Sequence, residues 1–295
     1  MTKPAVAIIG AGKVGSILAR ALGKRGYLLT GIASRTLESA RELAGELGVP
    51  AGNAGEVVKN AEIVFITTPD RCIQKTVEDL AGNYGFSKGQ IVLHMSGCLP
   101  VHVLKAAEEQ GALTGCMHPL QSFAGKKHTG EILKDIYFAL SGQEEAIKQA
   151  QNVVQDLGGS GFTILEQDKA LYHGAACIVS NYTVALLHWA GRLLKEIGLS
   201  DGQALAALLP LLKGTVKNIQ EMGAAASLTG PISRGDHITV KAHSRALLNK
   251  QEQNLYRELG KYTLAVALEK GDLELAQADE VLKILEGRDV DERCT

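Results

Sequence analysis

The segment Asp168–Asn181, DKALYHGAACIVSN, combines helix-forming apolar residues with reactive side chains at helical spacing. Its polar members include Lys169, His173, Cys177, Ser180 and Asn181. An α-helix turns about 100° per residue, which places these five within an arc of about 120°. A solvent-facing arc would normally carry Glu, Lys and Arg, so this composition favours the wall of a half-desolvated crevice. There a Lys or His can transfer a proton; the alternative is a helix–helix interface with hydrogen-bonded polar groups.

The opposite side of this helix is apolar. Leu171, Ile178 and Trp189 fall roughly 160–200° from Lys169 on the same helical wheel. We therefore expect the back of the helix to pack into the core while its polar front faces a bound molecule.

Three polar residues outside this helix are further candidates for substrate contact. Ser96 and His118 each follow an expected strand, and ligands of open α/β sheets bind at strand carboxyl ends. Both are also ordinary turn residues. Arg234, in the segment GPISRGD, can clamp a carboxylate with two hydrogen bonds. Alternatively, this segment only caps the next helix through Asp236.

A glycine-rich turn near the start of the chain predicts a dinucleotide site. Its residues match G-x-G-x-x-G and are Gly10, Ala11, Gly12, Lys13, Val14 and Gly15. The match follows an apolar strand and opens a helix, which is the context the motif requires. Glycines let the backbone approach a pyrophosphate, and the helix N-terminus offers N–H groups to it.

The end of the second strand indicates which dinucleotide is bound. An NAD site usually has Asp or Glu there, whereas this chain has Ser34, Arg35 and Thr36. Arg35 can form paired hydrogen bonds to a 2′-phosphate, and the two hydroxyls can donate to it, so we expect NADP. The alternative is a solvated Arg at a helix start. Thr68 and Pro69, after the next strand, are expected near the nicotinamide ribose.

The order of elements predicts an α/β domain followed by an all-helical one. We expect strands at 5–9, 27–33, 62–67, 90–95, 112–117, 136–141 and 163–165, separated mostly by helices that include 13–24 and 36–47. This alternation predicts a doubly wound, mostly parallel sheet. From residue 167 the chain is expected to be helical, at 167–197, 202–222, 236–258, 260–269 and 276–285. The predicted domains are therefore 1–165, which binds NADP, and 166–295, which binds substrate.

Composition narrows the class of protein. The chain has 295 residues, of which 45% are hydrophobic, and this suits two globular domains. Its net charge of −1 lacks the excess of positive charge expected of a protein that binds nucleic acid or acidic membranes. Its five scattered Cys form no CxxC pair, and no metal-ligand spacing occurs, so neither a disulfide framework nor a metal site is expected. No long uninterrupted apolar segment is present, so we expect a cytoplasmic protein without a membrane span.

In order along the chain, the glycine loop, SRT, TTPD, MSG, HPLQSF, YHGAACIVSN and GPISRGD resemble a known family. This family comprises the Rossmann-like NADP oxidoreductases whose C-terminal domain was catalogued as a domain of unknown function. That group resembles the superfamily of β-hydroxyacid dehydrogenases, 6-phosphogluconate dehydrogenase, pyrroline-5-carboxylate reductase and ketopantoate reductase. The resemblance implies a helical domain of the 6-phosphogluconate dehydrogenase type and homodimers formed through it. It also implies a Lys acid/base followed one turn later by Asn; Lys169 fits the first position, but His173 occupies the second.

These features together predict NADPH-dependent reduction of a small carbonyl acid, with ketopantoate as a specific candidate implied by the resemblance. Lys169 or His173 would supply the proton, and Ser96 and Asn181 would orient the carbonyl. His118, Ser180 and Arg234 would hold the rest of the substrate. The alternatives are an imine reductase of the pyrroline-5-carboxylate type, a reductase of a deazaflavin cofactor, and a non-catalytic NADP sensor.

Overall fold

The computed structural model describes residues 3–124 and 130–288. They form two compact units, residues 1–185 and 186–295. The predicted boundary at 165/166 coincides with the end of the sheet, whereas the units divide twenty residues later. The reason is that the helix after the sheet begins with contacts to the sheet's own residues, such as Lys169 to Ser141. Cys294, one of the five Cys, lies outside the described residues.

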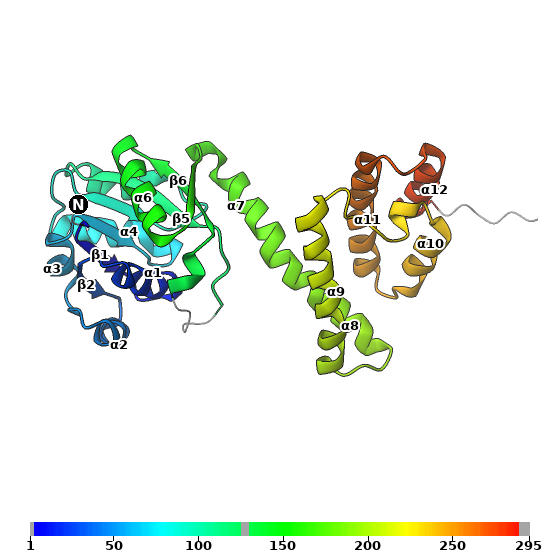
Figure 1. Cartoon of the computed structure of the whole chain (residues 1–295), viewed down its shortest axis with the longest axis horizontal. Helices are drawn as coiled ribbons and strands as arrows, with labels where there is room; N and C mark the ends of the chain where they lie inside the picture. The colour runs from blue at the N-terminus through cyan, green and yellow to red at the C-terminus, as the bar shows by residue number, and fades with distance from the viewer. Residues whose placement is uncertain (1–2, 125–129, 289–295) are drawn as a thin grey trace, which may run out of the picture. The chain divides into compact units, whose positions relative to one another are not determined.

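The first unit is built on a seven-stranded sheet with the order β2-β1-β3-β4-β5-β6-β7 (Figure 1). The strands are β1 Val6–Ile9, β2 Leu29–Ala33, β3 Ile63–Ile66, β4 Ile91–His94, β5 Leu113–Pro119, β6 Tyr137–Gly142 and β7 Ser160–Thr163. All neighbouring pairs are parallel except β5 and β6. The prediction of a doubly wound, mostly parallel sheet is confirmed.

Helices cover both faces of this sheet. One face packs against α1 Lys13–Lys24, α2 Leu37–Leu47 and α6 Glu144–Leu157. The other packs against α3 Ala54–Lys59, α4 Asp70–Asn83 and α5 Lys105–Glu108. The strands are apolar on both faces because both are buried, which is why they appear in the sequence as continuous apolar runs.

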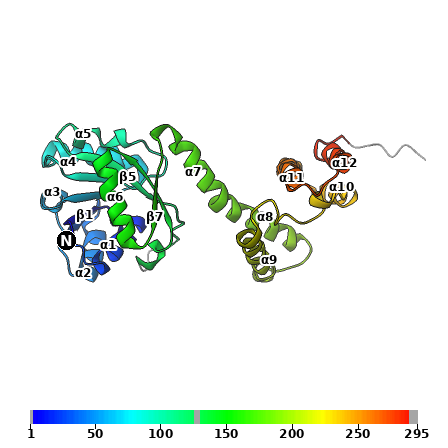
Figure 2. The same ribbon diagram turned by 45° about the horizontal axis from the view of Figure 1, so that its top comes forward.

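A long helix follows the sheet. It consists of α7 Lys169–Cys177, a π-helical turn over Ile178–Tyr182 and α8 Thr183–Glu196 (Figure 2). The expected buried back is wrong within this chain: Leu171 is 79% exposed and Ile178 is 58% exposed. The π turn also changes the phase of the helix, because it contains more residues per turn than the α-helix from which the faces were predicted.

This long helix has the length and composition of a membrane span. Among the described residues, Glu166–Glu196 is the one helix that is both long enough and apolar enough to cross a membrane, and its most apolar part is not buried. The sequence analysis expected no such segment, because no long uninterrupted apolar run is present in the chain. The finding concerns length and composition alone, and the core helix of a soluble protein can have the same properties.

The second unit contains the remaining helices. They are α9 Asp201–Met222, α10 His237–Ala246, α11 Lys250–Lys270 and α12 Leu275–Leu285. The predicted helices 236–258 and 260–269 are wrong in their division: the break falls at 247–249, where the Asn249 side chain accepts the Gln251 N–H and caps α11. Gly260 lies within α11 and does not interrupt it. A glycine is needed there for packing, because a Cβ would lie 2.5 Å from the Leu285 side chain of α12.

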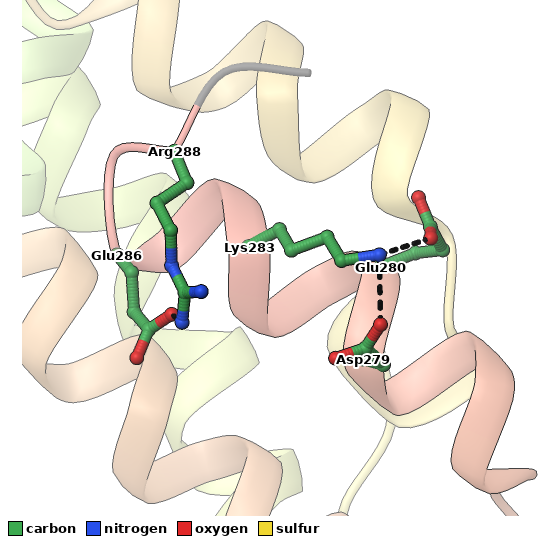
Figure 3. Close-up of polar contacts among 5 residues, drawn as sticks. All are labelled: Asp279, Glu280, Lys283, Glu286 and Arg288. Atoms are coloured by element: carbon green, nitrogen blue, oxygen red, sulfur yellow. Dashed lines mark hydrogen bonds and ion pairs between the residues drawn. The ribbon is translucent and has the colours of Figure 1, made fainter.

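The last three helices share a small apolar core that includes Val240, Leu264 and Val281. On the outside of α12, Lys283 bridges two carboxylates at 2.8 Å (Asp279) and 2.9 Å (Glu280), and Arg288 pairs with Glu286 (Figure 3). Exposed ion pairs of this kind contribute about 0–1 kcal/mol each, so burial in the core dominates the stability of this unit.

Candidate functional site at the carboxyl edge of the sheet

The glycine loop forms a cradle at the carboxyl end of β1. Gly10 has φ +119°, and a Cβ on Gly15 would lie 1.9 Å from the Gly10 carbonyl oxygen, so neither position accepts a side chain. Gly12 is different, because a Cβ there would meet nothing within 4 Å. Packing within the protein therefore does not require a glycine at this position, and the missing side chain leaves open space at the start of α1.

The N-terminus of α1 has the properties of an anion site. Gly12 is its N-cap and gives no side-chain cap, and no acidic residue occupies the first turn. The first N–H groups of an α-helix have no partner within the helix, and they carry the positive end of its dipole. A phosphate in the open space beside Gly12 would satisfy these groups.

Two neighbouring strand ends complete this part of the edge. Arg35 follows β2, is exposed, and makes no hydrogen bond or ion pair within residues 3–124 and 130–288. At the end of β3, the Thr67 hydroxyl donates to the Gly10 carbonyl at 2.7 Å and ties the loop down. The next hydroxyl, on Thr68, is buried without a hydrogen-bond partner among the described residues. An orphaned hydroxyl beside the glycine cradle fits a bound ribose or amide.

Ser96, at the end of β4, is used by the protein itself. Its hydroxyl donates to the Asp70 carboxylate at 2.7 Å and accepts the N–H groups of Cys98 and Leu99. The side chain is 4% exposed. The hydroxyl thus joins the loops after β3 and β4, and the prediction that Ser96 orients a substrate would require it to exchange one of these partners.

A polar row crosses the sheet at the same level. His94, Cys116 and Ser141 are register partners on β4, β5 and β6, so their side chains lie on one face. Lys169 covers the row, with its Nζ 3.3 Å from the Ser141 Oγ. The Lys169 side chain is 1% exposed, and it forms no ion pair with a carboxylate among the described residues. Lys169 is therefore buried in this structure, and its role as the proton donor stays a prediction.

The charge on Lys169 affects the groups around it. Burial, together with Lys169 and His118, lowers the pKa of His94 to about 3. The His94 Nδ1 accepts the Ser96 N–H at 3.1 Å, so the ring carries its proton on Nε2. That Nε2 is buried and has no partner among the described residues. The buried row therefore holds a neutral imidazole next to the Lys169 side chain.

His118 lies two residues beyond Cys116 on β5, on the same face and nearer the edge. Its Nδ1 lies 2.7 Å from the Tyr172 hydroxyl, and the two rings meet edge to face at 5.6 Å between centroids. Burial, His173 and Lys169 lower the pKa of His118 to about 4. Burial raises the pKa of Tyr172, so the phenol stays protonated at neutral pH.

His173 completes the cluster at Gly97. A Cβ on Gly97 would lie 2.7 Å from the His173 Cδ2 and 2.8 Å from the His118 Nε2. The two imidazole rings are 6.0 Å apart, and the His173 Nδ1 lies 3.8 Å from the Cys177 Sγ. Gly97 is thus the small residue that lets both rings reach the carboxyl edge of the sheet.

The other predicted substrate residues are on the π turn and in the second unit. Ser180 and Asn181 are on the π turn, and no contact joins either of them to His118 or His173 among the described residues. Arg234 is exposed in the second unit, on a short 3-10 turn that Gly235 ends. The neighbouring Asp236 caps α10 by accepting the Thr239 N–H, as the alternative interpretation proposed.

Sequence reasoning missed the residues that connect the site. Tyr172, His94 and Ser141 were absent from the predicted set, as was the link from Asp70 to Ser96. Tyr172 is next to His173 in the sequence, and it contacts His118 of β5 and Phe162 of β7. The register of β4, β5 and β6 is what places His94 and Ser141 in one row beside Lys169. A signal was available, because a His or Ser at the end of a fully apolar strand is conspicuous.

Comparison with known proteins agrees with this architecture. A Rossmann-like domain model matches residues 1–119, and the domain of unknown function DUF2520 matches residues 136–263. A Thermotoga maritima protein of known structure is 29% identical, with a TM-score of 0.73 over 89% of this chain and 99% of that one. A Bacteroides fragilis protein assigned as an NADP oxidoreductase is 24% identical, with a TM-score of 0.72 over 90% and 99%.

More distant similarities exist. Pyrroline-5-carboxylate reductase from Streptococcus pyogenes is 15% identical, with a TM-score of 0.60 over 96% of this chain and 100% of that one, and shares the fold. A Pyrobaculum aerophilum glutamyl-tRNA reductase is 32% identical over 123 residues, which is 37% of this chain but only 29% of that protein. Models of a Rossmann-like domain and of DUF2520 thus match two successive parts of the chain, and the chain shares the fold of the Bacteroides fragilis and Streptococcus pyogenes structures.

Proposed function

We propose that this protein is an NADPH-dependent oxidoreductase that reduces a small carbonyl or imine substrate. One observation carries the proposal: the open anion cradle at Gly12 and the imidazole pair at Gly97 lie on the same carboxyl edge of one parallel sheet. Only β3 separates β1 from β4, and neighbouring strands are about 4.8 Å apart. A ligand held at the cradle can therefore reach the imidazoles.

The residues present fit a nicotinamide dinucleotide. The α1 N-terminus would hold the pyrophosphate, Arg35 a 2′-phosphate, and the orphaned Thr68 hydroxyl a group of the nicotinamide half. When bound, NADPH supplies a hydride. The substrate carbon accepts that hydride, its C=O or C=N π pair moves to the heteroatom, and the heteroatom takes up one proton.

His173 is the proton source that the geometry favours over Lys169. The His173 ring is partly exposed and adjoins Gly97, whereas the Lys169 side chain is buried against the row of His94, Cys116 and Ser141. A general acid must come within hydrogen-bonding distance of the substrate, and a buried Lys cannot do so without leaving its row. Lys169 would then act through its charge on neighbouring groups.

A small 2-keto acid, ketopantoate included, is the substrate class that best suits the polar cluster. An imine is the second candidate, and the similarity of fold to pyrroline-5-carboxylate reductase favours it. Ser180, Asn181 and Arg234 remain candidates for binding the substrate carboxylate, with Arg234 suited by its guanidinium. A deazaflavin reductase and a non-catalytic sensor are the outcomes to expect if no such substrate is turned over.

We also propose a homodimer formed through the long helix. Its exposed apolar residues include Leu171, Ile178, Val179, Tyr182 and Val184. A monomer rarely leaves so many large apolar side chains in water, and a second copy would cover them. A lipid surface is the less suitable cover, because the same helix begins at buried Lys169 and contacts the sheet through Tyr172. Light scattering of the purified chain distinguishes a dimer from a monomer, and vesicle flotation detects a membrane-bound form.

Cofactor binding tests the first half of the proposal. NADPH and NADH are titrated by fluorescence into the wild type, Arg35→Ala and Arg245→Ala, the last being an exposed Arg on α10 that serves as control. Loss of charged hydrogen bonds in Arg35→Ala should weaken NADPH binding about 10–100-fold and leave NADH unchanged. Equal wild-type affinity for the two cofactors contradicts the NADP assignment.

Turnover tests the second half. NADPH oxidation is measured with small keto acids, including ketopantoate, and with cyclic imines, using wild type, His173→Gln and Lys169→Met. We expect His173→Gln to lower kcat about 10²–10⁴-fold with little change in NADPH affinity. Lys169→Met should have a smaller effect on kcat if the ammonium acts only through its charge. NADPH binding without oxidation across the panel would instead support the sensor.

A further inference from the structure

One hydrogen-bond donor in the site is unused by the protein. The His118 Nδ1 faces Tyr172, whereas its Nε2 lies at Gly97 and has no hydrogen-bond partner among the described residues. We infer that His118 is a catalytic residue that polarises the substrate carbonyl through Nε2–H as a neutral imidazole, and that Tyr172 is the positioning residue that fixes its tautomer. This inference rests on the proposed reductase function and assigns the group that binds the developing oxyanion.

Tyr172 determines where the proton of His118 lies. Burial raises the pKa of Tyr172, so the phenol stays protonated, and the His118 Nδ1 at 2.7 Å is its hydrogen-bond partner among the described residues; we assign the phenol as the donor of this hydrogen bond. An Nδ1 that accepts this hydrogen bond cannot carry a proton in the neutral ring. The single proton of neutral His118 is therefore on Nε2, the nitrogen at the carboxyl edge. Packing of Phe162 against the Tyr172 ring, at 5.9 Å, holds the phenol in place.

The surroundings of His118 keep the ring neutral. The groups that face it are His94 on β4, Cys116 on β5, and Lys169, Tyr172 and His173 on α7. The cation among them, Lys169, opposes a second positive charge nearby, and partial burial opposes it further. In the part of the chain that the structure describes, no carboxylate is among the groups that shift the pKa of His118; Glu166, near the start of this helix, accepts the Val101 N–H.

A neutral imidazole in this position suits the reaction. As the carbonyl accepts a hydride, negative charge grows on its oxygen, and a fixed N–H donor stabilises the charge without reorganising. Neutral imidazole donors of this kind are established in enzymes that polarise carbonyls. His118 thus holds its proton at Nε2 throughout, and the proton that the product needs comes from another group, which we assign to His173.

The tautomer of His118 is directly measurable on the full-length protein. Long-range ¹H–¹⁵N spectra of the imidazole rings are recorded with and without NADPH, and His118→Gln assigns the resonance. We expect a protonated Nε2 and an unprotonated Nδ1 at pH 7, with protonation of the ring only near pH 4. A ring protonated on Nδ1, or on both nitrogens at pH 7, overturns the inference.

Variants then separate positioning from folding. Tyr172→Phe should give a mixture of tautomers and lower kcat about five- to tenfold, with NADPH affinity unchanged. Tyr137→Phe is the matched control, because Tyr137 packs on the same Phe162 ring but does not contact His118. A single Nε2–H tautomer that survives in Tyr172→Phe removes Tyr172 from its assigned role.

Substitutions of His118 test the donor itself. His118→Leu should lower kcat about 10²–10³-fold, and His118→Gln should retain more activity, because its amide nitrogen can occupy the place of Nε2. Equal losses in the two variants contradict a donor role. If the wild type neither binds nor oxidises NADPH, the proposed function fails while the tautomer result still stands. If NADPH turnover occurs with His118 in another tautomer, only the present inference fails.

Discussion

The seven-stranded sheet and the helices between Lys169 and Met222 carry similar apolar residues but bury them to different extents. In the sheet, Val6, Phe65 and Phe138 are wholly inaccessible to solvent. In the long helix and α9, Lys169 and Ala204 are the buried residues. The sheet has helices of its own chain on both faces, whereas the helices after it have apolar faces that this chain leaves uncovered.

In the proposed homodimer, this difference separates a part that is stable within one chain from a part that a second copy covers. A region whose apolar surface is buried within one chain has a stability that is independent of protein concentration. A region whose apolar surface is exposed gains its stability by association, and its unfolding temperature then rises with concentration. The imidazole cluster belongs to both regions, because His118 is on the sheet and Tyr172 and His173 are on the helix.

The largest effect should come from the sheet core. Replacing the fully buried Phe65 by Ala removes a ring from β3 and leaves a cavity, which should lower the free energy of unfolding by about 3–5 kcal/mol. Denaturant titration at two protein concentrations measures it. The loss should be the same at both concentrations, and a loss that depends on concentration would show that the sheet also relies on association.

A pH effect of roughly 3 kcal/mol should arise from the buried imidazole of His94. Its folded pKa, about 3, lies below the unfolded value, so the unfolded state binds more protons between these values. Its contribution to stability is therefore present above about pH 6.5 and is lost as the pH falls toward 4. Urea titrations from pH 7 to 4 measure this loss.

His94→Asn keeps an acceptor for the Ser96 N–H and should flatten this pH dependence. His237→Asn, an exposed His at the start of α10, is the control. An unchanged slope in His94→Asn would assign the pH effect to another group.

A smaller effect should follow a charge on the exposed face of the long helix. Leu171→Glu should weaken self-association by at least about 30-fold, equivalent to about 2 kcal/mol, because it removes apolar contact and desolvates a charge. Sedimentation velocity measures it. Leu248→Glu is the matched control, since Leu248 is 90% exposed but lies between α10 and α11. Equal behaviour of the two variants would remove the distinction between the helix face and an ordinary exposed Leu.

The smallest effect should come from the surface ion pairs of α12. Lys283→Met removes the bridge to Asp279 and Glu280 and should lower the free energy of unfolding by less than about 1 kcal/mol. The change should also shrink in high salt, as thermal unfolding with and without 0.5 M NaCl would show. A larger effect would mean that α12 depends on charge more than on its apolar core.

The sheet was predictable because its signals are local. The strands around 6–9 and 63–66 are continuous apolar runs. The motif Gly10–Gly15 lies between a strand and a helix, which is the context that predicts a dinucleotide-binding turn. The site was predictable only in part: His118 and His173 were selected, but Tyr172 and His94 were not. Lys169 and Ser96 were assigned to a crevice, yet the structure uses both internally.

The helices of the C-terminal region were predicted, but the face expected to be buried is exposed and one helix boundary was misplaced. The wheel placed Leu171 in a core, because a sequence shows that an apolar face exists and not what covers it. The break between α10 and α11 was misplaced, since a Gly in a helix can be a packing contact, as Gly260 is against Leu285, instead of an end.

The amino-acid sequence by itself determined the strands, the glycine cradle, the arginine expected at a 2′-phosphate and the order of the two parts, because each depends on residues close together along the chain. The tertiary structure decided which polar groups meet. The register of β4, β5 and β6 brings His94, Cys116 and Ser141 into one row under Lys169, and one turn of α7 places Tyr172 against His118. Such contacts depend on the alignment of distant strands, and a one-residue shift in that alignment would move every side chain to the opposite face.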